Sequence, residues 1–156
     1  MMKRITLALV TATVAFCGAL AAEANADVVL GYASKWWSEQ DSLRPAVFSR
    51  CGVSSRKVWK GGIDDAALDG AALFISTCAP SKLATNDLAA IRRFKEKGGK
   101  VVANEKHKDL ARNIQFTLNY LERNFPSLRG KCAAGHAFLA EVEADNLEAR
   151  KSFKSV

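Results

Sequence analysis

The fold is decided by residues 69–104, which read DGAALFISTCAPSKLATNDLAAIRRFKEKGGKVVAN. Residues 71–78 form a short apolar run behind the turn signal Asp69-Gly70, a pattern typical of a strand that is buried on both faces, as parallel strands are. Residues 100–104 repeat this apolar pattern after an intervening helix. The stretch therefore predicts one strand–helix–strand unit with parallel strands.

The helix inside this unit has clear ends and one apolar face. Leu88, Ile91 and Phe94 recur at helical spacing, and the charged residues of the segment take the opposite side. Gly98-Gly99 supplies the left-handed conformation that ends a helix. The residues that offer capping oxygens at its start are Thr85, Asn86 and Asp87. A helix of this kind packs one stripe against a sheet.

The flanking sequence continues the alternation of strands and helices. Before the central unit we expect, in order, a strand over 27–33, a loop over 34–40, a helix capped by Asp41 or Ser42 and ended by Cys51-Gly52, a strand over 55–60 and a helical turn over 64–68. After it we expect an amphipathic helix over 108–124, a loop over 127–136 and a final helix from Ala137 to about Phe153 with Phe138, Val142 and Leu147 inward. This order predicts a three-layer, flavodoxin-like α/β domain with about four parallel strands, helices on both faces and two C-terminal helices.

The first 26 residues have the pattern of a secretory signal peptide. Lys3 and Arg4 precede an apolar stretch over residues 5–22, and Ala24-Asn25-Ala26 is a small-x-small cleavage signal. A membrane anchor is the alternative for this stretch. We expect cleavage near Ala26, a periplasmic or secreted location, and a single α/β domain over residues 27–156 with no membrane span.

The charge of the chain indicates an anionic partner. Lys and Arg exceed Asp and Glu by 23 to 16, which gives a formal charge of +7. The basic residues are spread over the predicted helices rather than gathered in one stripe, so we do not expect a nucleic-acid partner. An anionic ligand, a carbohydrate or an anionic envelope surface suits an exported basic domain better.

Three of the four cysteines lie outside the leader. Cys17 falls within it, and an oxidising compartment favours one disulfide among Cys51, Cys78 and Cys132. The sequence leaves all three pairings open. We expect the bridge to join Cys51 to Cys78, near helix and strand ends that a sheet brings together, with Cys132 as the third thiol.

A family resemblance rests on the same central stretch. The run from Asp69 through the Pro80 loop to the helix that ends in Gly98-Gly99 resembles the N-terminal half of class I glutamine amidotransferase-like domains, in the branch of trehalose-utilisation-like proteins, over about residues 64–104. The resemblance implies a flavodoxin-like fold. Catalytic members of that family carry a cysteine on a glycine-flanked elbow, and Cys78 lacks such an elbow because Thr77 and Ala79 flank it.

A ligand of an open parallel sheet binds outside the carboxyl ends of the strands. The segments expected at this edge are rich in cations and aromatic rings, which can pair with an anion or pack against a sugar. Ordinary solvated lysines and packed tryptophans are the structural alternative. The residues that we expect to bind the ligand are Lys35, Trp36, Trp37, Lys60, Asn104 and His107.

The alternative function is a cysteine-dependent hydrolase. Cys78 would be its nucleophile, with His107 or His136 as the base. The spacing of Cys132 and His136 suits two zinc ligands, but two more would have to come from distant segments, so we expect no metal. The strand–helix junctions lack a phosphate loop and a dinucleotide fingerprint, so we expect no cofactor and favour a non-catalytic binding protein.

Overall fold

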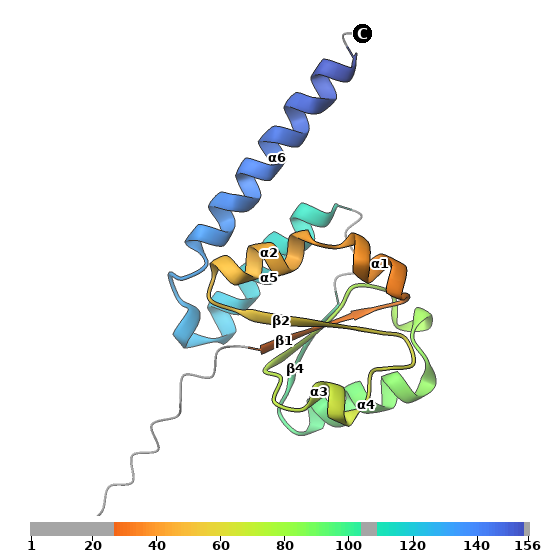
Figure 1. Ribbon diagram of the computed structural model, residues 1–156. Coiled ribbons are helices and arrows are strands. Elements are labelled where there is room, and N and C mark those ends of the chain that lie inside the picture. Colours follow the sequence, from red (N-terminus) through yellow and green to blue (C-terminus); the bar gives the residue numbers. More distant parts are fainter. Residues whose placement is uncertain (1–26, 104–108, 155–156) are drawn as a thin grey trace, which may run out of the picture.

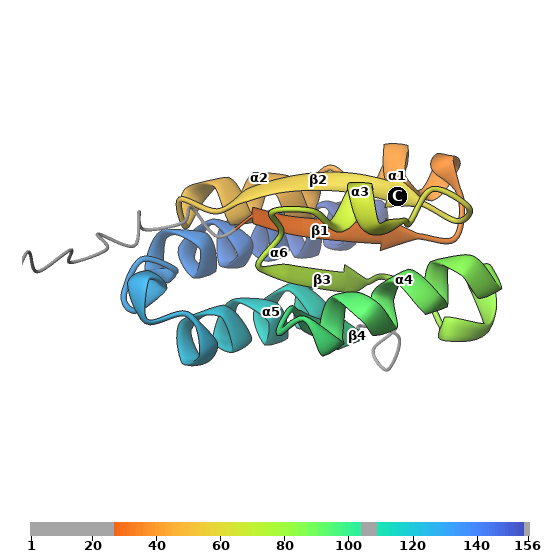
Figure 2. The same ribbon diagram turned by 90° about the horizontal axis from the view of Figure 1, so that it is seen from below.

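The computed structural model describes residues 27–103 and 109–154 and shows an α/β domain (Figure 1). Its strands are β1 (Asp27–Tyr32), β2 (Ser54–Trp59), β3 (Leu73–Ser76) and β4 (Lys100–Ala103). They form one parallel sheet in the order β2-β1-β3-β4, which Figure 2 shows side by side. The predicted flavodoxin-like arrangement of four parallel strands is confirmed.

The helices cover both faces of this sheet. They are α1 (Lys35–Gln40), α2 (Leu43–Arg50), α3 (Asp65–Leu68), α4 (Thr85–Glu96), α5 (Leu110–Asn124) and α6 (Ala133–Lys154), with single 3-10 turns η1 (Pro80–Lys82) and η2 (Pro126–Leu128). In Figure 1, α2 and α5 lie on one side of the sheet, while α3 and α4 lie on the other. The expected three layers and the two C-terminal helices are therefore present.

Alternate strand residues supply the two halves of the core. Val28 and Leu30 of β1 pack under α2, α5 and the start of α6, whereas Val29, between them, packs with Phe74 against α4. Each of these side chains is completely buried. A strand whose two faces are both covered must be apolar at successive positions, which explains why the apolar runs in the sequence are continuous.

Asp87 anchors α4 to the segment that follows β2. Its carboxylate accepts hydrogen bonds from the backbone N–H groups of Ala84 at 2.9 Å, Gly61 at 2.9 Å and Ile63 at 3.2 Å. Asp87 is 1% exposed, so these donors replace the water that the carboxylate loses. The predicted capping role of Asp87 thus extends to a loop far away in the sequence.

Two expected elements differ from the structure. Residues 35–40 form helix α1 rather than a loop, because the Ser34 side chain caps it by accepting from the Trp37 N–H at 3.5 Å. Helix α6 begins at Ala133 rather than at 137, and Leu147, which we expected to face inward, is 53% exposed. The outer part of α6 projects away from the sheet in Figure 1.

Within the described residues, no helix has the length and apolarity needed to cross a membrane. The expected signal peptide over residues 1–26 lies outside the described residues, so the export prediction stays a prediction.

Candidate ligand-binding site

A cavity of about 730 Å³ opens at the carboxyl ends of β1 and β3. The chain leaves β1 toward β2 on one side, and β3 pairs with β1 on the other side, so this is the point where the strand order reverses. Ligands of open α/β sheets bind at this position. The residues that line the cavity are Tyr32, Ala33, Ser34, Trp37, Gln40, Asp41, Arg44, Thr77, Cys78, Ala79, Lys82 and Leu110.

A buried cluster of Tyr32, Asp41 and Arg44 forms the polar wall of the cavity. The Tyr32 hydroxyl donates to Asp41 Oδ2 at 2.6 Å, and the Arg44 N–H donates to Asp41 Oδ1 at 3.3 Å. The Arg44 guanidinium also pairs with the Asp41 carboxylate through Nη1. Asp41 is 8% exposed and Arg44 is 6% exposed, so both charges are held away from bulk water.

Burial and pairing fix the protonation states of this cluster. Burial raises the pKa of Tyr32 above its ordinary value, and the hydrogen bond to Asp41 and the negative charge of that carboxylate raise it further. For Asp41, burial acts to raise the pKa, but the Arg44 charge and the hydrogen bond from Tyr32 bring it below its ordinary value. At neutral pH Tyr32 is therefore a neutral phenol and Asp41 is a carboxylate.

The position of Arg44 follows from the helix that carries it. Val47 and Phe48, three and four residues later, are completely buried, so Arg44 lies on the same inward face of α2. Its Nε is buried and has no hydrogen-bond partner among the residues that the structure describes. An unsatisfied buried donor is uncommon in folded proteins and marks this wall as a place where polar contacts are incomplete.

Residues after β3 form the opposite wall. The Thr77 hydroxyl donates to the Gly31 carbonyl at 2.9 Å, and the Ser76 hydroxyl donates to the Cys78 carbonyl at 2.7 Å. These two bonds hold the chain as it leaves the sheet. Cys78 is partly exposed at the cavity, and the exposed Lys82 of η1 adds a cation to its rim.

Two exposed tryptophans stand at the same edge of the sheet. Trp36 and Trp37 are 57% and 58% exposed, and their ring centroids lie 4.5 Å apart in an edge-to-face arrangement. Trp37 lines the cavity, whereas Trp36 is not among the lining residues. One ring of the predicted aromatic pair therefore faces the candidate ligand space.

Two further predicted binding residues, Lys35 and Lys60, do not line the cavity. Lys35 Nζ lies 3.8 Å from a Glu39 carboxylate oxygen and 5.8 Å from the Trp59 ring centroid. Lys60 follows β2 and is exposed at the same edge without lining the cavity. Asn104 and His107 lie outside the described residues.

The expected bridge between Cys51 and Cys78 is wrong. The structure shows no disulfide between the cysteines that it describes. Cys51 precedes β2 and Cys78 follows β3, and the register through β1 separates these two ends by four residues, or about 13 Å. Bridged cysteines have Cα atoms within about 7 Å. His136 lies in the first turn of α6, next to Cys51, so it is also far from Cys78.

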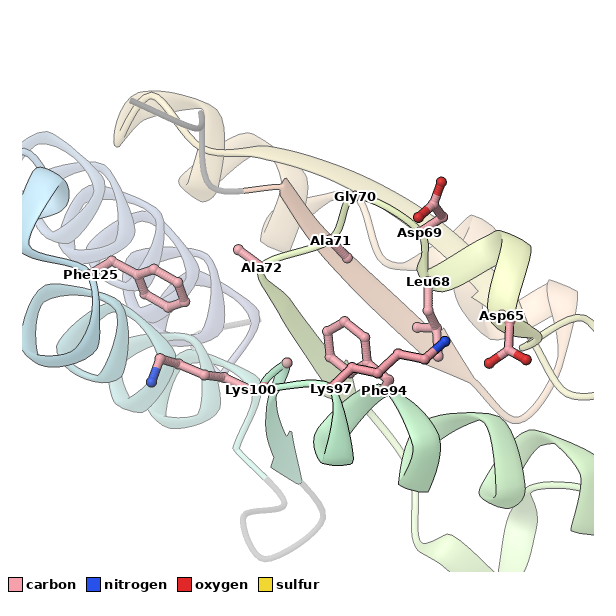
Figure 3. Close-up of a pocket in the computed structure, with 12 residues that line it drawn as sticks. Asp65, Leu68, Asp69, Gly70, Ala71, Ala72, Phe94, Lys97, Lys100 and Phe125 are labelled. Carbon is pink, nitrogen blue, oxygen red and sulfur yellow. The ribbon is translucent and has the colours of Figure 1, made fainter. Parts of the chain in front are cut away.

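A second cavity, of about 440 Å³, lies at the amino ends of the strands (Figure 3). Its walls are Phe94, Phe125, turn glycines and exposed charges, among them Asp65, which pairs with Arg93 at 3.0 Å. Lys100 Nζ lies 5.9 Å from the Phe125 ring centroid. No group of three His, Cys, Asp or Glu side chains within the described ranges is arranged to hold a metal ion.

The fold and the cavity define an α/β domain with a candidate ligand site at its switch point. Comparison of the chain with protein-family models, with curated proteins and with solved structures finds no match. The resemblance to glutamine amidotransferase-like domains therefore stays a prediction from residues 64–104.

The sequence predicts a ligand site at this edge of the sheet but does not predict most of the residues of the cavity wall. The sequence pattern predicts Tyr32 only as part of a strand and Asp41 only as a helix cap. The spacing of Arg44 to Val47 and Phe48 is the signal that could have found the buried guanidinium, because a cation three and four residues from two inward apolar residues must itself face the core.

Proposed function

We propose that this chain is an exported cell-envelope binding or accessory protein, without catalytic activity, that takes a small anionic carbohydrate in the cavity between β1 and β3. The observation that carries the proposal is the presence of the exposed Trp37 ring and the buried Arg44 guanidinium in the walls of one cavity at the switch point. A tryptophan face packs against a sugar ring, and a guanidinium recognises a carboxylate or phosphate group.

The charge of the cavity supports an anionic group on the ligand. Arg44 and Lys82 bring two cations to the lining, and Asp41 brings one carboxylate. Asp41 is engaged by Tyr32 and Arg44, so the exposed Lys82 is the cation that is best placed to attract an incoming anion. Attraction of this kind weakens as salt screens it.

Export is supported by the N-terminal sequence alone. Lys3 and Arg4 before the apolar stretch, and Ala24-Asn25-Ala26 after it, have the pattern that a signal peptidase recognises. N-terminal sequencing of the protein recovered from the periplasm tests this part of the proposal. A start at Asp27 is expected, and a start at Met1 would contradict export with cleavage.

Binding is tested by titrating the protein with glucuronate, glucose and acetate while tryptophan fluorescence and amide chemical shifts are recorded. We expect glucuronate to bind more tightly than either of the others, with shifts at residues of the cavity. Trp37→Ala should weaken binding about tenfold, which corresponds to about 1.4 kcal/mol. Trp59→Ala is the matched control, because Trp59 is exposed at the same edge outside the cavity.

A second pair of variants tests the cation. Lys82→Ala should weaken glucuronate binding and leave glucose binding unchanged, whereas Lys60→Ala should change neither. If Trp37→Ala and Trp59→Ala weaken binding equally, the cavity is not the binding site. If glucose and glucuronate bind with equal affinity, the site does not recognise an anionic group.

The cysteine-hydrolase alternative is favoured by one observation, namely that Cys78 lies in the wall of the same cavity. Its base would have to be His107, since His136 is at the other end of the sheet. Under this alternative, Cys78→Ser abolishes hydrolysis of an ester or amide substrate and leaves the thermal midpoint unchanged. Under the binding proposal, Cys78→Ser leaves glucuronate affinity within about twofold of the wild type.

A further inference from the structure

Cys51 and Cys132 meet where α2 ends and α6 begins. Cys51 is the C-terminal cap of α2, and the Cys132 carbonyl accepts the first hydrogen bond of α6, from the His136 N–H at 2.9 Å. Cys51 is 1% exposed and Cys132 is 0% exposed. Both belong to one apolar cluster with Val47 and Leu139, so the two thiols share the core contact between the helices.

The sulfur atoms are in direct contact with the facing segment. The two thiols lie close enough for each to affect the pKa of the other, and the Cys51 thiol donates to the Val47 carbonyl oxygen at 3.6 Å. A Cβ placed on Gly135 would lie 2.5 Å from Cys51 Sγ, so only a glycine lets the first turn of α6 approach this closely. A disulfide requires two backbone segments to approach closely, and the segments that carry Cys51 and Cys132 do so here.

We propose that Cys51 and Cys132 are joined by a disulfide bond in the exported protein, and that this bond ties the start of α6 to the end of α2. The reaction is exchange with an oxidant of the disulfide class, such as glutathione disulfide. One cysteine thiolate attacks the oxidant and releases a thiolate, and the second cysteine thiolate then attacks the mixed disulfide and releases the other. The protein loses two protons and two electrons, and the oxidant gains the two electrons.

Burial decides when this bond forms. It raises the pKa of both thiols, and together with the nearby Cys51 and the Glu122 charge it raises that of Cys132 to about 12. Because the thiolate is the reactive form, the folded protein exchanges slowly at neutral pH. The bond therefore forms while the chain folds, and once formed it is shielded from reductants.

The bond would enclose most of the sheet in one covalent loop. Strands β2, β3 and β4 and helices α3, α4 and α5 all lie between Cys51 and Cys132 in the sequence. A long enclosed loop restricts the unfolded chain strongly, so closing it stabilises the native state. Cys78 remains outside the bridge, at the cavity on the other end of the sheet.

The test uses the full chain, unfolded and then refolded in a glutathione redox buffer, labelled with iodoacetamide under denaturing conditions and digested with trypsin. Cleavage after Arg and Lys places Cys51, Cys78 and Cys132 on separate peptides, 51–56, 61–82 and 132–150. We expect peptides 51–56 and 132–150 to be linked and unlabelled, and 61–82 to carry label. Label on all three peptides, or a link that includes 61–82, would overturn the proposal.

The thermal midpoint tests the same disulfide without peptide mapping. Wild type that is unfolded, reduced and refolded in dithiothreitol should have a thermal midpoint roughly 10 °C below that of the oxidised protein. Cys78→Ser, the matched control, should show the same drop, and Cys132→Ser should show none. A drop of the same size in Cys132→Ser would contradict the assignment of the bridge even if that variant is less stable than the wild type.

Discussion

The two ends of the sheet differ in the kind of side chain that they bury. At the carboxyl ends of β1 and β3, an ionised Asp41 and Arg44 are buried beside an open cavity. At the amino ends, the buried contact between α2 and α6 includes the uncharged side chains of Cys51 and Cys132, and the cavity there is lined by exposed charges. Buried charges are costly and persist where they are paired, whereas buried cysteine sulfur packs like a small apolar group. The carboxyl end therefore combines buried charge with an open cavity, whereas the amino end buries only uncharged groups between α2 and α6.

The largest expected effect is the difference in unfolding free energy between variants that break the ion pair at one end of the sheet or the other. Arg44→Met leaves the buried Asp41 carboxylate without its counter-charge and should lower the free energy of unfolding by about 3–5 kcal/mol. Arg93→Met, the control, breaks the half-exposed pair with Asp65 at the amino end and should lower it by less than about 1 kcal/mol. Urea unfolding of both variants measures the difference, and equal losses would remove the distinction between the ends.

A smaller effect is expected from closing the space at the amino end. Gly135→Ala drives a Cβ to within 2.5 Å of Cys51 Sγ and 3.2 Å of the Val47 carbonyl oxygen. The resulting displacement of α6 should lower the free energy of unfolding by about 1–3 kcal/mol. Ala134→Ser changes the exposed neighbouring position and should stay within about 0.5 kcal/mol of the wild type. A tolerated Gly135→Ala would show that the contact between α2 and α6 is looser than described.

Acid should weaken the carboxyl end. Burial acts to raise the pKa of Asp41, but the Arg44 charge and the Tyr32 hydrogen bond outweigh it and hold this pKa below its ordinary value of 3.8. The ionised Asp41 carboxylate therefore stabilises the fold above about pH 4, and this stabilisation is lost as the pH falls through the folded-state pKa. The free energy of unfolding of the wild type should therefore fall between about pH 5 and pH 2, and that of Asp41→Asn should fall less steeply. An unchanged slope in Asp41→Asn would contradict the prediction.

The smallest expected effect belongs to the tryptophan pair. The edge-to-face contact between Trp36 and Trp37 is largely exposed, so a double-mutant cycle with Ala at both positions should give a coupling of about 0.5 kcal/mol in the free energy of unfolding. Such weak coupling leaves the Trp37 ring available to a ligand. A coupling above about 1.5 kcal/mol would assign the pair a structural role instead.

The sheet was predictable because its signals are local. The apolar run after Asp69-Gly70, the helical period from Leu88 to Phe94 and the stop at Gly98-Gly99 each fix one element, and parallel pairing follows from their alternation. Helix α1 was missed because its six residues present no apolar stripe, and both of its tryptophans are exposed. Its only local signal was the capping hydroxyl of Ser34.

The start of α6 and the cavity wall depend on contacts that a local pattern does not contain. Gly135 reads as a loop residue, yet it lies inside a helix because Cys51 Sγ occupies the space of a side chain. Asp41 and Arg44 read as exposed helix-end charges, yet they pair with each other in the core. Whether Asp41, Arg44 and Gly135 are buried depends on the residues that pack against them in the folded chain, and a local sequence pattern does not contain those contacts.

The placement of β1 has a consequence for how the chain folds. β1 is the first described strand, and it pairs with both β2 and β3. Neither pairing can form until residues much later in the chain have been synthesised. Ser54, opposite Asp27, lies 27 residues on, and Thr77, which bonds to Gly31, lies 46 residues on. Pairings this distant close slowly, so Val28, Val29 and Leu30 stay exposed to other chains until the later strands arrive.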